Sequence, residues 1–180
     1  MTLKPRVFLD ANVLIRGVTF PRFPYEVLQH AARKEIAAIV SPLVLDTARL
    51  YVRERFPDYQ AALEALLEFV DLELAPDPPL EEVAAHAGLV RDPKDIPVAL
   101  AAIAARAEYL VSTDRDFTDV DDTTAELRRH LKPVSVGAFL HEVMGWSHEA
   151  LSAIERRRWS DLPVLRRTAG SPGERPFWEE

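Results

Sequence analysis

Short apolar runs alternate along the chain with longer segments in which apolar residues recur every three or four positions. Short β-branched or apolar runs are typical of buried strands, and the longer period is typical of helices that bury one face. Five runs are predicted to be strands: Arg6 to Leu9, Ile36 to Val40, Asp71 to Leu74, Tyr109 to Ser112 and Pro133 to Val136. The alternation predicts an α/β fold in which βα units form a mainly parallel sheet.

The segments between the strands carry helical patterns. Pro42 to Phe56 is the best marked, because Ser41 is placed to cap it and Pro42 stands where a missing N–H costs nothing. Further helices are predicted over Asp58 to Val70, Leu80 to Ala87, Ile96 to Arg106, Gly137 to Met144 and Ser147 to Arg158. Proline, glycine and charge after Trp159 predict a loose tail. We therefore expect one domain over residues 1–145, and a C-terminal helix with a loose tail over residues 146–180.

Composition narrows the possible functions. The chain has 180 residues, and its hydrophobic content of 48% is enough for one packed core. With 29 acidic and 22 basic residues the net charge is -7, so bulk electrostatics would not hold nucleic acid, and a polyanionic substrate needs local arginine or lysine. The absence of cysteine excludes disulfides and thiolate metal sites. No apolar segment approaches the roughly 18 residues of a membrane span. We expect a cytoplasmic protein with no membrane partner.

Four aspartates stand where a parallel sheet binds ligands. Asp10 ends the first strand in VFLDANVLI, and Asp114 follows the fourth in YLVSTDRDF. Asp46 and Asp95 stand early in helices, in SPLVLDTARLYV and RDPKDIPVALAAI. Ligands of such sheets bind outside the carboxyl ends of the strands. If the first and fourth strands are neighbours, the four acids converge on one crevice.

Each acid also has a purely structural interpretation. Asp95 would cap its helix, Asp46 would be solvated on a helix face, and Asp114 would be a turn residue. Asp10 fits this interpretation least, because an unpaired charge among apolar residues costs several kcal/mol. Clustered carboxylates repel one another unless a cation neutralises them, and an all-oxygen site suits Mg²⁺ or Mn²⁺. Such a site activates water, which favours phosphodiester hydrolysis.

These four segments together resemble a PIN domain, and the pattern from Arg6 to Val143 is similar to the VapC-like toxins of bacterial toxin–antitoxin pairs. The resemblance implies a three-layer α/β/α fold around a five-stranded parallel sheet. It further implies that residues 1–145 form a Mg²⁺- or Mn²⁺-dependent ribonuclease with RNA as substrate and an antitoxin protein as partner. The family's metal ligands carry over to Asp10, Asp46, Asp95 and Asp114, with Asp116 as an auxiliary acid.

Two further positions match small polar residues that the family carries near its acids, Asn12 and Ser112. One position departs from the family, because Asp46 stands where glutamate is commoner and its reach is one methylene shorter. Arg49 and Arg53 follow Asp46 at three and seven residues, along one helix face, and are predicted to contact the substrate phosphates. The alternative for both arginines is a salt-bridged surface.

Two other functions compete with the nuclease. Haloacid dehalogenase-like phosphatases also place an aspartate after the first strand, but their second aspartate is Asn12 here, which cannot act as a general acid. The second competitor is a catalytically inactive PIN-like module that binds RNA or protein. Acidic residues at all four positions favour catalysis, because a binding module does not need them.

The C-terminal stretch ERRRWSDLPVLRR contains five arginines, and all three tryptophans lie late in the chain. Exposed arginine and tryptophan are favoured at interfaces, which suggests that this segment binds an antitoxin or a second copy of the chain in a homodimer. The alternative is that Trp146 and Trp159 pack back onto the domain's own sheet.

Overall fold

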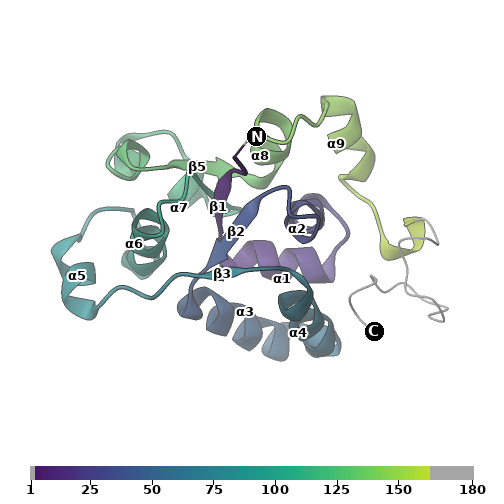
Figure 1. Ribbon diagram of the computed structural model, residues 1–180, viewed down its shortest axis with the longest axis horizontal. Coiled ribbons are helices and arrows are strands. Elements are labelled where there is room, and N and C mark those ends of the chain that lie inside the picture. The colour runs from purple at the N-terminus through teal and green to yellow at the C-terminus, as the bar shows by residue number, and fades with distance from the viewer. Residues whose placement is uncertain (1–2, 163–180) are drawn as a thin grey trace.

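The structure is a computed structural model that describes residues 3–162. Five strands form one sheet in the order β3-β2-β1-β4-β5, and every neighbouring pair is parallel (Figure 1). The strands are β1 (Arg6–Leu9), β2 (Ala37–Val40), β3 (Glu73–Leu74), β4 (Tyr109–Ser112) and β5 (Lys132–Ser135). The predicted five-stranded parallel sheet is confirmed.

The helices cover the sheet between these strands. They are α1 (Ala11–Thr19), α2 (Phe23–Ala32), α3 (Pro42–Arg55), α4 (Gln60–Phe69), α5 (Leu80–Ala85), α6 (Ile96–Ala104), α7 (Arg115–Thr118), α8 (Val136–Glu142) and α9 (His148–Ile154). Short 3₁₀ helices are η1 (Pro57–Tyr59), η2 (Pro93–Asp95), η3 (Asp122–Thr124), η4 (Leu127–Arg129) and η5 (Trp159–Asp161). Within residues 3–162 no helix is long and apolar enough to cross a membrane.

The strand order explains the three layers. From β1 to β3 the chain steps across the sheet in one direction, and from β3 to β5 it steps back past β1 in the other. Because parallel crossovers are right-handed, α1 to α4 lie on one face and the helices that lead to β4 and β5 lie on the other. Figure 1 shows α6 and α1 on opposite sides of the sheet. The predicted three-layer α/β/α fold is confirmed.

Most predicted helix and strand bounds agree with the structure to within a few residues. The fifth strand shows the physical reason for one difference. Pro133 to Val136 was predicted, whereas β5 ends at Ser135. The Ser135 hydroxyl accepts a hydrogen bond from the backbone N–H of Ala138 at 3.2 Å and so caps α8, which begins at Val136. A cap residue ends the strand because its extended backbone leads directly into the helix.

Trp146 and Trp159 pack back onto the domain, as the second interpretation predicted, but their contacts are with helices α1 and α2 and not with the sheet. The indole N–H of Trp159 donates to the carbonyl of Thr19 at 3.1 Å, and its ring meets Tyr25 edge-on with centroids 5.4 Å apart. Trp159 is only 7% exposed. The indole N–H of Trp146 donates to His30 at 3.0 Å. The rest of the predicted tail, residues 163–180, lies outside the described residues, and the domain boundary after residue 145 stays a prediction.

Candidate active site

The strand order reverses between β1 and β4, so the residues that follow these two strands face the same crevice. Asp10 follows β1 and caps α1, where its Oδ1 accepts a hydrogen bond from the backbone N–H of Ala11 at 2.8 Å. Its Oδ2 accepts from the Ser112 hydroxyl at 2.7 Å and from the Asn12 amide at 3.1 Å. Asp10 is 9% exposed. The buried carboxylate is therefore satisfied on both oxygens.

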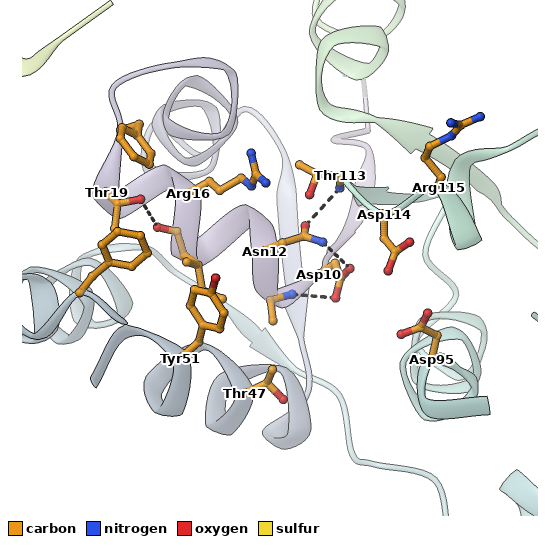
Figure 2. A pocket seen from close by; sticks show the side chains of 14 residues that line it. Asp10, Asn12, Arg16, Thr19, Thr47, Tyr51, Asp95, Thr113, Asp114 and Arg115 are labelled. Carbon is orange, nitrogen blue, oxygen red and sulfur yellow. Dashed lines mark hydrogen bonds between the residues drawn. The ribbon is translucent and has the colours of Figure 1, made fainter. Parts of the chain in front are cut away.

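Asn12 and Ser112 join the ends of the two strands around Asp10. The amide oxygen of Asn12 accepts from the backbone N–H of Thr113 at 3.1 Å (Figure 2). The hydroxyl of Ser112 also accepts from the backbone N–H of Asp114 at 2.9 Å. Asn12 lines the cavity described below, whereas Ser112 is fully buried. Ser112 therefore holds the acids in place without facing a ligand.

Asp114 and Asp95 complete the cluster from the other face of the sheet. Asp114 caps α7, with its Oδ1 accepting from the backbone N–H of Asp116 at 2.9 Å, so it has a structural role as a helix cap and not as the predicted turn residue. Asp95 begins α6 but makes no side-chain cap hydrogen bond, which removes its structural interpretation. Its Oδ2 is buried with no hydrogen-bond partner among the residues described. Figure 2 shows the Asp95 and Asp114 side chains pointing toward one another.

Burial and repulsion from nearby carboxylates disfavour the charged forms of Asp95 and Asp10. The pKa of Asp95 is raised to about 7, first by burial and then by the charges of Asp114 and Asp10. Burial also raises the pKa of Asp10, against the opposing effect of its hydrogen bonds to Ser112 and Ala11, while Asp114 adds to the rise. A buried carboxyl held close to like charges gains most from a cation.

Three predicted site residues do not reach this cluster. Asp46 is exposed on α3 and does not line the cavity, whereas the next residue, Thr47, does. Successive side chains of an α-helix project about 100° apart around its axis, so when Thr47 faces the cavity the Asp46 side chain projects past it. Arg49 forms an ion pair with Glu64 at 2.8 Å, which matches its salt-bridge alternative, and Arg53 is exposed away from the cavity.

Two residues beside the acids, Asp92 and Arg91, were not predicted. Carboxylate oxygens of Asp92, Asp95 and Asp116 lie within 4.8 Å of one another. Arg91 pairs with Asp116 at 3.1 Å and so offsets part of this negative charge. The sequence signal for Asp92 was its position three residues before Asp95 in RDPKD, which places both acids on the same turn.

A cavity of about 790 Å³ contains the acidic cluster. Its lining combines the acids Asp10, Asp95 and Asp114 with the cations Arg16 and Arg115 and with the rings of Phe20, Tyr51 and Phe56. The donor set consists of carboxylate oxygens and includes one buried oxygen, on Asp95, that has no hydrogen-bond partner in the part of the chain that the structure describes. Mg²⁺ and Mn²⁺ prefer such hard oxygen ligands, so the residues present fit a divalent ion.

Known proteins resemble the chain in its family pattern and in its fold. A family model described as a PIN domain matches residues 6–116. The structure is similar to that of PAE2754 from Pyrobaculum aerophilum, with a TM-score of 0.51 and 20% identity over 79% of this chain and 97% of the other. It is also similar to VapBC2 from Rickettsia felis bound to a DNA fragment from their promoter, with a TM-score of 0.50 and 20% identity over 72% of this chain and 97% of the other. At this identity the two structures show the fold alone. No curated protein matches the chain.

Proposed function

The chain belongs to the PIN-domain family, whose model matches more than half of its length, and from this premise we propose that it is a metal-dependent endoribonuclease that hydrolyses RNA phosphodiesters. PIN domains are generally nucleases, which supports the reaction class. The observation that carries the proposal is that Asp10, Asp95 and Asp114 line one cavity, where one Asp95 oxygen has no hydrogen-bond partner among the described residues. The choice of RNA over other phosphodiesters rests on the family resemblance.

The three cavity acids would hold the ion, which we propose to be Mg²⁺ or Mn²⁺. A divalent ion supplies stabilisation of the charge that develops on the phosphate oxygens and raises the acidity of water. Asp10 is oriented for this role by its bonds to Ser112 and Asn12. Asp114 is oriented by its cap bond to α7. These contacts fix Asp10 and Asp114 before substrate arrives, which limits reorganisation during the reaction.

Asp95 and Asp116 have different tasks in this proposal. Without a cation, burial and the charges of Asp114 and Asp10 raise the pKa of the Asp95 carboxyl to about 7. A bound ion would stabilise its ionised form and would take as a ligand the Oδ2, which has no hydrogen-bond partner within residues 3–162. Asp116 is an auxiliary acid whose charge adds to the rise of the Asp95 pKa, and Arg91 holds it at 3.1 Å.

A calorimetric Mn²⁺ titration tests the site without a known substrate. We expect the wild type to bind Mn²⁺ and Asp10→Asn to lose binding. Asp46→Asn is the matched control, because it removes an exposed carboxylate that does not line the cavity. A parallel assay of RNA cleavage with Mn²⁺ tests the activity. A wild type that neither binds Mn²⁺ nor cleaves RNA would leave a PIN-like binding module as the function.

We further propose that the nuclease acts as the toxin of a toxin–antitoxin pair. The VapC-like pattern of the four acid-bearing segments supports this role. So does the fold shared with the Rickettsia felis VapBC2 structure, although that likeness concerns the fold alone. Induced expression in a bacterial host is expected to arrest growth, and Asp95→Asn is expected not to. Equal growth with both chains would refute the toxin role.

A further inference from the structure

The cavity that holds the acids extends to a wall of aromatic rings. We propose that this wall is a stacking subsite for one base of an unpaired RNA strand, next to the phosphate that lies at the acids. The inference rests on the proposed nuclease function and specifies how the substrate is held. The wall consists of Phe20, Tyr51 and Phe56, and is called the ring wall below.

The ring wall forms because two helices end at the same place. Phe20 is the C-cap of α1 and Phe56 is the C-cap of α3, and their rings meet edge-on with centroids 6.4 Å apart. Tyr51 lies one turn before the end of α3, with its ring centroid 6.2 Å from that of Phe56. The three rings support one another, so the wall is preorganised for a flat ligand.

The rings are also accessible. Phe20 is 41% exposed and Tyr51 is 46% exposed, although both line a cavity. Figure 2 shows Tyr51 on α3 extending toward the cavity, on the same helix face as Thr47. Accessible rings beside polar groups are typical of binding surfaces, because an aromatic ring in water lacks the favourable free energy of burial until a ligand covers it.

Two arginines give the ring wall a positive border. Arg16 lines the cavity, and it also lines a neighbouring cavity of about 280 Å³ together with Arg22. The guanidinium of Arg22 lies 5.1 Å from the centroid of the Phe20 ring. Within residues 3–162 neither arginine forms an ion pair, although Glu155 lines the second cavity as well. In a chain with a net charge of -7, such arginines mark the local attraction that a polyanion needs.

An unpaired nucleotide matches both parts of the cavity. Its phosphate suits the ion at the acids and the guanidinium of Arg16, and its base presents a flat π face to the ring wall. Bases inside a duplex are stacked on one another and cannot reach such a wall. A cavity of about 790 Å³ is within the range that holds small organic ligands, so there is room for a nucleotide. The subsite therefore selects unpaired strands through stacking.

The test measures binding separately from cleavage. A short fluorescent single-stranded RNA of randomised sequence is titrated against the full chain, with Ca²⁺ in place of Mg²⁺ to slow hydrolysis. We expect Tyr51→Ala to weaken binding by about 10-fold, because stacking of a base on an aromatic ring has a value of that order. Tyr51→Phe keeps the ring and is expected to stay within about twofold of the wild type. Leu50→Ala is the matched control, because Leu50 has the same exposure on the same helix and does not line the cavity.

A second ligand separates stacking from charge. A fully abasic strand of the same length offers phosphates without bases, so the wild type and Tyr51→Ala are expected to bind it equally. Arg16→Gln is expected to weaken binding of both strands by the same factor and to reduce the salt dependence. Arg53→Gln is its matched control, since Arg53 is exposed outside the cavity.

The outcomes distinguish the subsite from the nuclease. A wild type that cleaves RNA but binds it no better than Tyr51→Ala would overturn the subsite and leave the nuclease in place. Ring-dependent binding without cleavage would support the subsite and overturn the nuclease. If sedimentation showed that Tyr51→Ala separates a dimer while RNA affinity stays unchanged, the ring wall would instead cover a second copy of the chain, and the subsite would be refuted.

Discussion

Replacing Asp95 by asparagine is expected to stabilise the metal-free protein. The pKa of Asp95 is raised from 3.8 to about 7, so ionising it in the folded state is unfavourable. A shift of this size corresponds to about 4 kcal/mol at about 1.4 kcal/mol per unit. Because Asp95 is only half-buried, solvent screening reduces the value to about 2 kcal/mol. For a domain of this length, that free energy raises Tm by about 4–8 °C.

The sign of the pH dependence follows from the direction of the shift. An aspartate whose pKa is higher in the folded state stays protonated up to a higher pH in the folded protein than in the unfolded chain. The contribution of Asp95 to wild-type stability therefore falls as pH rises from about 4, where the unfolded side chain ionises, to about 7, where the folded one does. The asparagine of the variant does not titrate, so the difference in Tm between Asp95→Asn and the wild type is small near pH 4, widens up to pH 7 and stays constant above it.

Thermal unfolding with EDTA and with Mn²⁺ measures both effects. With EDTA at pH 8, Asp95→Asn is expected to melt at a higher temperature than the wild type. Mn²⁺ at about 100 times its dissociation constant is expected to stabilise the wild type by about 2.7 kcal/mol and the variant by much less. Asp46→Asn, which removes an exposed carboxylate, should change neither value. A lower melting temperature for Asp95→Asn in EDTA would refute the account of carboxylate repulsion.

Two other substitutions test contacts around the site. Ser112→Ala removes the hydroxyl that bridges Asp10 and the backbone N–H of Asp114. Urea unfolding should show that the free energy of unfolding falls by about 1–3 kcal/mol, and calorimetry should show about 10-fold weaker Mn²⁺ binding. Unchanged metal affinity would contradict the positioning role of Ser112. Arg157→Ala breaks a 2.7 Å ion pair with Glu26, which is only 2% exposed, so urea unfolding should show a loss of about 3–5 kcal/mol. A loss below about 1 kcal/mol would place that pair in the range of exposed ones.

The sequence was most informative where burial and topology act together. A charge at the end of an apolar strand has few structural explanations, so Asp10 was identified from the energetic cost of burying it. Asp114 was predicted on another ground, its place after the fourth strand, because ligands of parallel sheets bind outside the carboxyl ends of the strands. Both predictions needed only that β1 and β4 be neighbours, which the observed strand order provides.

The sequence was least informative where the rotation of a helix decides the outcome. Asp46 and Thr47 differ by one residue, yet only Thr47 lines the cavity. Which side of α3 faces the sheet is set by the burial of Val44, Ala48 and Val52, and the motif alone did not fix that phase. The ring wall was missed for a related reason, because it depends on two helices ending at one place in space.

The two sides of the acidic cluster differ in how firmly the protein holds them. Asp10 accepts three hydrogen bonds between two buried strands, so packing of the sheet fixes it whether or not a cation is bound. Asp95 lies at the junction of a 3₁₀ helix and α6, where its buried oxygen has no described partner and like charges surround it. A cation would therefore bind against a rigid carboxylate on one side and recruit Asp95 on the other. On this argument the destabilisation that Asp95 causes without metal and the affinity that it adds with metal come from the same unsatisfied oxygen.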